Sequence, residues 1–207
     1  MKGSDGYNLP GKLTNDVVKE YIARGTYIYP PAESLRLITD IFSYCKAEIP
    51  KWNTISISGY HMAEAGATPV QEVGFTLADG IEYVRAAIAS GQDVDEFAPR
   101  LAFFFVSRTT ILEEVAKFRA ARRIWADVMR NEFGAKDHKS LKLRFHTKTA
   151  GVQLTAQMPV VNLIHGRERD LVALRGGTTD LQPSSIVAAN TTPVGKRGQL
   201  RTATRAG

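Results

Sequence analysis

A single histidine, His61, follows an alternating apolar stretch in the sequence NTISISGYHMAEAGATPV, residues 53–70. A histidine there could be a satisfied core residue, a metal ligand or a proton donor to a bound substrate. The other histidines, His138, His146 and His165, show no HxxxH or HxxE spacing, so we predict no metal site. An imidazole at a strand end can donate a hydrogen bond to a carbonyl oxygen on which charge develops. The small residues that follow would let a ligand approach the backbone.

Three basic residues have positions that suit the binding of anions. Arg24 precedes a stiff, aromatic, proline-bearing loop in the sequence YIARGTYIYPP. An arginine held by such a loop can clamp a carboxylate with two parallel hydrogen bonds. Lys51 and Arg100 both precede predicted strands, and a pair of cations near a ligand channel could meet phosphate groups. Each of the three could also be a solvated surface residue, and the residues alone leave that choice open.

The elements that must position these side chains alternate between strands and helices. Alternating or continuous apolar runs predict strands, and apolar residues at helical spacing predict helices. The predicted strands are 54–58, 101–106 and 141–147. The predicted helices are 33–46, 67–90 and 110–133. Thr110 and Glu113 have the spacing of a capping box at the start of the last helix.

Strands and helices that alternate at this spacing form right-handed βαβ units, so the predicted fold class is α/β with a parallel sheet. Ligands in such folds gather at the carboxyl ends of the strands. His61 follows the first predicted strand. Ser107 and Arg108 follow the second, and His146 closes the third. The polar residues of interest therefore fall at predicted strand ends.

The composition is that of an ordinary globular protein, with 43% hydrophobic and 23% charged residues in a chain of 207. No apolar run reaches the roughly 18–20 residues of a membrane-spanning helix. Residues 1–16 lack the apolar core of a secretory signal. Cys45 is the only cysteine, which excludes an internal disulfide and a cysteine-based zinc cluster. We therefore expect no membrane partner and a cytoplasmic location.

Residues 165–207 are predicted to be a divergent basic tail without sustained periodicity. The net charge of the chain is +6, and residues 166–207 supply +4 of it, from seven basic and three acidic residues. Basic tails can bind phosphate backbones, but this one has no Phe, Tyr or Trp on which a base could stack. We expect no nucleic-acid partner, and we expect most of the tail to be poorly ordered.

Five stretches, taken together and in order, resemble the large subunit of methylmalonyl-CoA mutase. They are NDVVKEYIARGTYIYPP, PKWNTISISGYHMAEAGAT, FTLADGIEYVRAA, DEFAPRLAFFF and KFRAARRIWA. The resemblance covers about residues 10–164, so we expect residues 1–164 to form a partial acyl-CoA mutase barrel domain. In that family the substrate threads along the axis of a (β/α)8 TIM barrel. The resemblance implies that this chain is an internal part of such a barrel, with parallel strands.

Where residues match the family's motifs, the resemblance implies roles for them. His61 matches the histidine that hydrogen-bonds the substrate thioester carbonyl and helps to shield the radical, and Tyr60 matches the tyrosine beside it. Arg24 matches the arginine that pairs with the free carboxylate of the substrate, where the similar isobutyryl- and 2-hydroxyisobutyryl-CoA mutases have glutamine. Because a buried carboxylate without a cation is costly, Arg24 favours a dicarboxylic acyl-CoA. Lys51 and Arg100 match positions that contact the CoA substrate.

The sequence also departs from the family's motifs. His146 matches a histidine in the RxHxQT strand end, but Lys148 puts a charge where the family has an amide. Thr14 stands where the family usually has glutamine, which shortens one polar contact to the substrate. After Ile164 the polar tail replaces the family's arginine, apolar helix and GGTQSLHTNS motif.

The resemblance implies an isomerase, an intramolecular transferase that uses adenosylcobalamin to interconvert methylmalonyl-CoA and succinyl-CoA through a radical. No D-x-H-x-x-G cobalamin motif occurs in the sequence. We therefore expect the cofactor-binding domain to be absent from this chain. The expected partners are an acyl-CoA substrate and a cobalamin-binding chain or second mutase subunit, and we expect the fragment to be inactive alone. Three alternatives stay open: a related mutase of the ethylmalonyl or isobutyryl type, a non-catalytic fragment that needs a partner chain, and a truncated or frame-shifted product.

Overall fold

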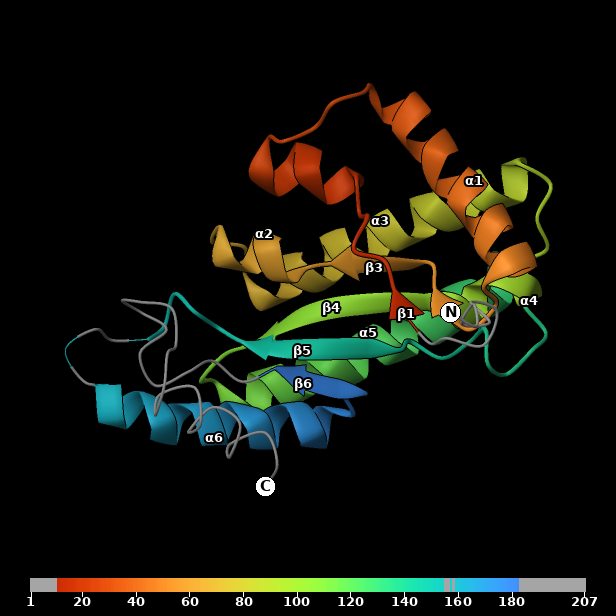
Figure 1. Ribbon diagram of the computed structural model, residues 1–207. Helices are drawn as coiled ribbons and strands as arrows, with labels where there is room; N and C mark the ends of the chain where they lie inside the picture. The colour runs from red at the N-terminus through yellow and green to blue at the C-terminus, as the bar shows by residue number, and fades with distance from the viewer. Residues whose placement is uncertain (1–10, 155–156, 158, 183–207) are drawn as a thin grey trace, which may run out of the picture.

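The computed structural model describes residues 11–154, 157 and 159–182. They form an α/β fold whose paired strands run parallel, and this fold is part of a (β/α)8 barrel (Figure 1). The strands are β1 (Gly11–Lys12), β2 (Trp52–Asn53), β3 (Ile55–Ser58), β4 (Leu101–Ser107), β5 (Phe145–Thr149) and β6 (Asp180–Gln182). The α-helices are α1 (Pro31–Glu48), α2 (Tyr60–Glu64), α3 (Pro69–Ala89), α4 (Val94–Phe97), α5 (Ile111–Asn131) and α6 (Pro159–Gly176). Two short helices of other kinds are the π-helical turn η2 (Glu20–Arg24) and the 3₁₀ turn η3 (Ala98–Arg100).

The main sheet has the strand order β3-β4-β5-β6, which is also the order of these strands along the chain. Helices α3, α5 and α6 lie in the connections, and each of them packs against the next. A doubly wound sheet would reverse its strand order at one point. Strands that keep chain order, with their helices along one face, instead build the wall of a barrel. β1 extends this wall, because it pairs with β2 and only Thr54 separates β2 from β3.

The two faces of the sheet differ in chemistry. Side chains along a strand alternate between faces, and Phe103, Phe105 and Phe145 face the helices, where they are almost fully buried. Phe104 and His146 belong to the opposite face, which is the inner face of a barrel, and both are only half-buried. The sheet therefore has one apolar side that holds the fold and one more polar side that is available to a ligand.

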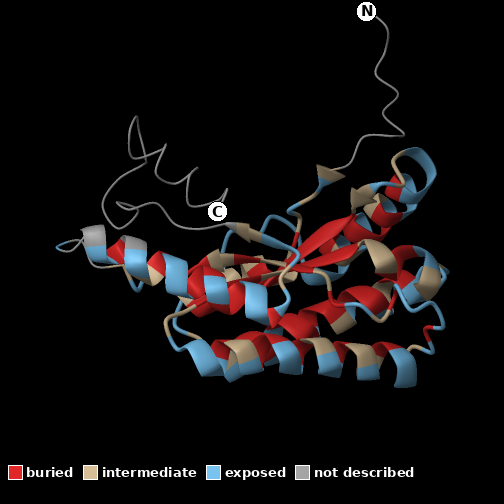
Figure 2. Ribbon diagram, turned by 90° about the horizontal axis from the view of Figure 1, so that it is seen from below, coloured by how far each residue is buried: buried red, intermediate tan, exposed pale blue. Residues whose placement is uncertain are grey.

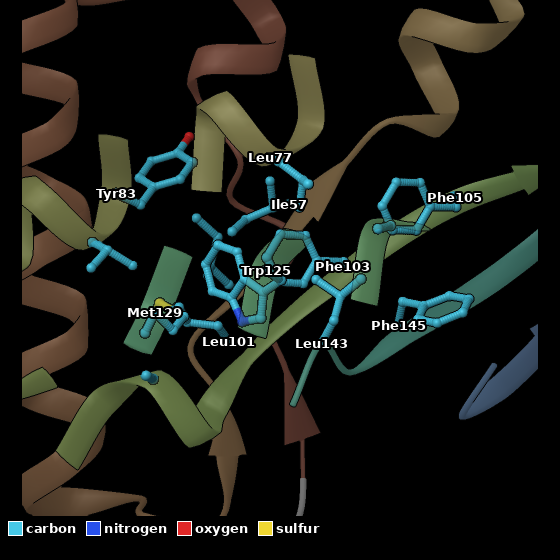
Figure 3. Close-up of a cluster of buried hydrophobic side chains, with 14 of the residues drawn as sticks. Ile57, Leu77, Tyr83, Leu101, Phe103, Phe105, Trp125, Met129, Leu143 and Phe145 are labelled. Atoms are coloured by element: carbon cyan, nitrogen blue, oxygen red, sulfur yellow. The ribbon is translucent and has the colours of Figure 1, made fainter. Parts of the chain in front are cut away.

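The core lies between the sheet and its helices (Figure 3). Trp125 of α5 meets the ring of Phe103 edge-on, with 4.9 Å between the ring centroids. Leu77 and Tyr83 reach the same cluster from α3 (Figure 3). A Cβ at Gly80 of α3 would lie 3.1 Å from both Phe103 and Trp125. Glycine at residue 80 therefore allows α3 to approach the sheet closely.

The helices carry buried residues on the side of the sheet and exposed residues on the outer side (Figure 2). In α5 the buried residues Phe118, Ala121 and Trp125 recur at helical spacing. Within the described ranges, we find no helix that is both long enough and apolar enough to span a bilayer.

Lys117 of α5 forms a buried ion-pair network at the end of β4. Its Nζ donates to Glu72 of α3 at 2.8 Å, to Glu114 at 2.7 Å and to the backbone oxygen of Val106 at 2.8 Å. Glu72 accepts a hydrogen bond from the backbone N–H of Val106 at 2.8 Å, and Glu114 accepts one from that of Arg108 at 3.1 Å. Burial raises the pKa of Glu72, against the lowering effect of Lys117. The network fixes the carboxyl end of β4 on two helices at once.

Most predicted elements are confirmed. The helices predicted at 33–46, 67–90 and 110–133 are α1, α3 and α5, and the strands predicted at 54–58 and 101–106 are β3 and β4. The capping box predicted at Thr110 is wrong, since its side chain makes no capping hydrogen bond. A capping box instead joins Thr68 and Gln71 at the start of α3.

The third predicted strand, 141–147, is displaced. The strand begins at Phe145 and continues to Thr149, whereas the preceding residues form turns in which Ser140 donates its N–H to the oxygen of Asp137. Leu143 is buried from this irregular segment, so its apolar character reflects burial rather than a strand.

Residues 165–182, the described part of the predicted tail, contain the end of a helix and a short strand. α6 runs through the predicted boundary at 164/165 to Gly176, and β6 pairs with β5. Ser107 donates its hydroxyl to the backbone oxygen of Arg169 at 3.0 Å, and Thr147 donates to the hydroxyl of Thr178 at 2.9 Å. Polar contacts therefore help to hold a segment whose sequence lacks apolar periodicity. The rest of the predicted tail, 183–207, lies outside the described residues.

The buried ion-pair network generates a stability prediction. Lys117→Met leaves Glu72 and Glu114 buried without their cation, so we expect a loss of about 3–5 kcal/mol in the free energy of unfolding. Urea denaturation at pH 7, followed by circular dichroism, measures it. Lys139→Met, at an exposed position, is the matched control and should change stability by less than about 0.5 kcal/mol. Equal stability of the two variants would contradict the role of the network.

Candidate functional site

His61 lies at the carboxyl end of a strand, as its sequence context predicts. β3 ends at Ser58, and α2 carries His61 in its first turn. A Cβ at Gly59, between the two elements, would collide with the hydroxyl of Thr76 on α3, so glycine is needed for this close turn. The hydroxyl oxygen of Ser58 lies 2.7 Å from Nδ1 of His61. This hydrogen bond orients the imidazole ring.

The imidazole of His61 is neutral at pH 7. Burial is the main cause that lowers the pKa of His61 to about 4. Nearby cations lower this pKa further, and the carboxylate of Glu20 opposes them. These cations are Lys19, Arg24 and Lys148. When the Ser58 hydroxyl donates to Nδ1, the ring proton resides on Nε2, where it is available to a carbonyl oxygen.

Three rings from three elements stack on the inner face beside His61. Phe104 of β4 stacks on Tyr60 of α2 at 4.8 Å and on His146 of β5 at 4.2 Å, measured between ring centroids. The interplanar angles are 10° and 11°. Burial, with a smaller effect of Lys12, lowers the pKa of His146 to about 4, so this ring is also neutral at pH 7. The stacked rings place a row of mostly apolar ring edges next to the hydrogen-bonding group of His61.

The carboxylate of Asp16 ties the end of β3 to two other segments. One oxygen, Oδ2, accepts a hydrogen bond from the backbone N–H of Ser58 at 2.7 Å. The other, Oδ1, accepts from the hydroxyl of Tyr83 on α3 at 2.7 Å and from the backbone N–H of Lys19 at 3.2 Å. Tyr83 itself accepts from the backbone N–H of Val18 at 2.9 Å. Asp16 therefore sets the position of the segment that leads into η2 relative to the strand that leads into α2.

Arg24 reaches the neighbourhood of His61 because η2 packs against α2. It is the last residue of η2, and its side chain is 51% exposed. Its Nη1 lies 3.7 Å from a carboxylate oxygen of Glu20, which also pairs with Lys19. Since one carboxylate serves two cations, the surroundings of His61 carry net positive charge from these residues.

Lys51 and Arg100 lie at the opposite, amino-terminal end of the sheet. Lys51 precedes β2 and is exposed, and Arg100 ends η3 directly before β4. Arg100 and Trp52 line a hollow of about 180 Å³ at this end. β4 has seven residues, which span about 20 Å at roughly 3.3 Å per residue. The length of a strand therefore separates these two cations from His61.

Two predicted site residues, His146 and Thr14, do not lie at the end of a strand. His146 does not close its strand, as the sequence predicted, because β5 begins only at Phe145 and His146 is its second residue. It nevertheless joins the site, since it points to the inner face and stacks on Phe104. Thr14 is exposed in the segment between β1 and η2, two residues before Asp16.

Sequence reasoning missed three residues of the site. Asp16 left only a weak signal, an acidic residue before an apolar pair, and Ser58 looked like an ordinary polar position of an alternating strand. Phe104 lies within the continuous apolar run of the strand predicted at 101–106, where nothing distinguishes it from its neighbours, yet it is half-buried and central to the stack. Each of these roles depends on a contact with a distant part of the chain.

The arrangement suits an elongated ligand with two different ends. A neutral imidazole and an excess of cations lie at the carboxyl ends of the strands, where an acid group and a carbonyl could bind. Two further cations lie at the amino ends, where phosphate groups could bind. Among the residues that the structure describes, no three His, Cys, Asp or Glu side chains gather closely enough to hold a metal ion.

The Ser58 contact generates a prediction about the tautomer of His61. We expect nitrogen NMR to show the Nε2–H form at pH 7 and protonation of the ring near pH 4. Ser58→Ala should give a mixture of tautomers, because Nδ1 loses its hydrogen-bond partner. Ser56→Ala is the matched control, since the buried Ser56 hydroxyl has no hydrogen-bond partner among the described residues. Dominance of the Nδ1–H form in the unchanged chain would refute this arrangement.

The low pKa of His146 predicts acid sensitivity. The unfolded chain binds a proton at this residue near pH 6.5, whereas the native protein resists protonation until about pH 4. Lowering the pH from 6.5 to 4 therefore stabilises the unfolded state relative to the native state. His146→Phe keeps a ring on Phe104 and should reduce this loss, measured as the melting temperature across that range. His138→Phe, at an exposed position, should leave the loss unchanged, and the same slope in both variants would contradict the assignment.

Comparison with known proteins gives consistent matches. The family model described as Methylmalonyl-CoA mutase matches residues 1–205. Methylmalonyl-CoA mutase of Escherichia coli (strain K12) is 51% identical over 86% of this chain and 25% of its own length. The methylmalonyl-CoA mutase large subunit of Propionibacterium freudenreichii subsp. shermanii is 48% identical over 89% of this chain and 25% of its own length. The 2-hydroxyisobutanoyl-CoA mutase large subunit of Aquincola tertiaricarbonis is 45% identical over 93% of this chain and 34% of its own length.

These relatives are much longer than the chain, which spans about a quarter of the length of the methylmalonyl-CoA mutases it matches. The match nevertheless extends over nearly the whole chain, and it agrees with a barrel wall whose inner face carries Tyr60, His61 and His146. The chain belongs to the methylmalonyl-CoA mutase family.

Proposed function

We propose that the chain forms an acyl-CoA-binding part of an isomerase that interconverts methylmalonyl-CoA and succinyl-CoA. The observation that carries the proposal is the separation of charges along one sheet. Cations and a neutral imidazole lie at the carboxyl ends of the strands, and Lys51 and Arg100 lie about 20 Å away at the amino ends. The groups of an acyl-CoA are arranged in a matching way, with the acyl group at one end of the molecule and the phosphates at the other.

The proposed roles follow from this placement. Nε2 of His61 donates a hydrogen bond to the thioester carbonyl oxygen, and it does so without adding a charge because the ring is neutral. Arg24 pairs with the free carboxylate of the acyl group. Tyr60 and His146 stack on the Phe104 ring, and this group of rings excludes water from the reacting part. Lys51 and Arg100 contact the CoA portion.

Adenosylcobalamin, which the mutase family uses, would supply the radical that starts the rearrangement. Nδ1 of His61 hydrogen-bonds Ser58, and the proposed role of its Nε2 is to donate to the substrate. The ring of His146 is stacked on Phe104. The sequence lacks a D-x-H-x-x-G motif. We propose that other residues, on a cobalamin-binding chain or a second mutase subunit, hold the cofactor.

The names of two relatives support the idea of a partner, because both are called large subunits. The open edges of the described sheet also fit a barrel that other residues complete. Cys45 is buried and free of any disulfide, which fits the proposed cytoplasmic location, since thiols stay reduced there.

A second candidate is a related mutase for a different acyl group, and the Aquincola tertiaricarbonis relative gives it support because its name states 2-hydroxyisobutanoyl-CoA. The two candidates differ in whether the acyl group carries a free carboxylate. Arg24 at the carboxyl end of the site favours methylmalonyl-CoA, because Arg24 shares the carboxylate of Glu20 with Lys19 and a free carboxylate on the acyl group would give it a partner of its own.

Arg24→Gln tests the choice between these candidates. Calorimetric titration of the 207-residue chain compares methylmalonyl-CoA with isobutyryl-CoA, in which a methyl group replaces the carboxylate. We expect the unchanged chain to bind methylmalonyl-CoA more tightly, and Arg24→Gln to weaken that binding about tenfold while isobutyryl-CoA is unaffected.

The matched control is Arg36→Gln on α1, since the side chain of Arg36 is exposed and pairs only weakly with Asp40 at 3.9 Å. It should change neither affinity. Equal binding of the two esters by the unchanged chain would favour the second candidate, and a similar loss for both esters in Arg24→Gln would remove Arg24 from the carboxylate site.

A further inference from the structure

Lys148 lies on the inner face of the sheet at the end of the site where His61 lies. In β5 the residues Phe145, Thr147 and Thr149 are buried on the helix side, whereas Lys148 belongs to the opposite, half-buried set. Its register partner on β4 is Val106, one residue before that strand ends. Lys148 is therefore near the carboxyl end of the sheet.

The ammonium group of Lys148 is close to both proposed catalytic side chains. Its Nζ lies 4.9 Å from the centroid of the Tyr60 ring. Its charge also acts on His61, where it opposes protonation of the imidazole. The ring contact places this cation beside Tyr60, and its effect on the neighbouring His61 agrees with that position.

Lys148 has no carboxylate partner among the described residues, although other lysines of the molecule do. Lys117 pairs with two glutamates, and Lys19 pairs with Glu20. Glu64, an acid on the neighbouring helix α2, accepts hydrogen bonds from the backbone N–H groups of Gly151 and Val152 at 3.1 and 3.2 Å. Glu64 is thus held by the backbone after β5 and forms no ion pair with Lys148, so the charge of Lys148 is available to another anion.

We propose that Lys148 is a specificity-determining residue that, together with Arg24, binds the free carboxylate of a dicarboxylic acyl-CoA. This inference rests on the proposed function, because it assumes that an acyl-CoA lies along the inner face. It goes further by assigning a second cation to the acyl end of the ligand.

The position of Lys148 along its strand decides which anion of the ligand it meets. Phosphate groups of the CoA portion would lie near Lys51 and Arg100, about a strand length away at the amino ends. Lys148 is at the carboxyl end with His61, which binds the thioester in the proposed arrangement. The acyl carboxylate is the anion within reach of that end.

A purely structural role for Lys148 would be its contact with the Tyr60 ring. A cation–π contact of this kind depends on the charge as well, so loss of the charge alone does not separate the two roles. The separation comes from the ligand: a structural role affects all acyl-CoA esters alike, whereas a carboxylate contact affects only esters that carry the carboxylate.

The experiment compares succinyl-CoA with butyryl-CoA, which has a methyl group in place of the carboxylate. Affinities are measured by calorimetric titration for the 207-residue chain and for the variants Lys148→Gln, Lys148→Arg and Lys142→Gln. We expect Lys148→Gln to weaken succinyl-CoA about tenfold and to leave butyryl-CoA unchanged. Lys148→Arg keeps the charge and should restore most of the selectivity. Lys142→Gln, at an exposed position before β5, should behave like the unchanged chain.

The outcomes separate this inference from the proposed function. If the unchanged chain shows no preference for succinyl-CoA, or binds neither ester, both ideas are wrong. If Arg24→Gln abolishes the preference but Lys148→Gln keeps it, the function stands and the role of Lys148 is wrong. A similar loss for both esters in Lys148→Gln likewise assigns Lys148 to structure or to the CoA portion.

A measurement without ligand tests the placement itself. NMR titration of His61 should show a higher pKa in Lys148→Gln than in the unchanged chain, because one of the cations that oppose protonation is gone. Lys142→Gln should leave the pKa of His61 unchanged. An unchanged pKa in Lys148→Gln would show that the ammonium does not act at the site, which overturns the proposal.

Discussion

The site depends on the buried carboxylate of Asp16, because three segments of the chain meet at its two oxygens. The donors come from the end of β3, from α3 and from the segment before η2. A carboxylate taken out of water is costly unless such donors compensate it, and burial is indeed the main cause that raises the pKa of Asp16. Burial and the proximity of Asp16 also raise the pKa of Asp79 to about 8, so Asp79 is protonated at pH 7 and does not add a second charge. The hydrogen bonds of the Asp16 carboxyl group hold the helix of Arg24 beside the helix of His61.

The fold follows largely from periodic burial, and it is predictable where apolar side chains mark the buried face. α1, α3 and α5 each bury an apolar stripe, and β4 is mostly apolar. β5 escaped prediction at its true position because Thr147 and Thr149 occupy buried positions of the helix face. A neighbouring hydroxyl satisfies Thr147, so no hydrophobic residue is needed there. α6 escaped for a similar reason, since Arg169 is fully buried and donates to the backbone oxygen of Ala150 at 2.8 Å.

The site was predictable where a short motif carries the information, as for Tyr60 and His61 at a strand end. It was not predictable where distant segments combine. The pairing of Phe104 with His146 depends on the register between β4 and β5, and the effect of Arg24 on His61 depends on the packing of η2 against α2. Only the folded chain shows that Glu64, the acid on the neighbouring helix, hydrogen-bonds Gly151 and Val152 and does not pair with Lys148. Sequence patterns identify which side chains belong to the candidate site, whereas the charges that surround each side chain depend on how the chain folds.

The alternation of faces in β5 has a consequence for how this region can evolve. His146 and Lys148 occupy even positions between the buried residues Phe145, Thr147 and Thr149. Loss or gain of a single codon at the start of the strand itself, with the pairing to β4 retained, would move every later residue of the strand to the opposite face. The imidazole and the ammonium would then enter the core, and threonine and phenylalanine would line the barrel interior. Insertions and deletions are consequently compatible with this site only in the turns, and the strand itself can change only by substitution of its residues.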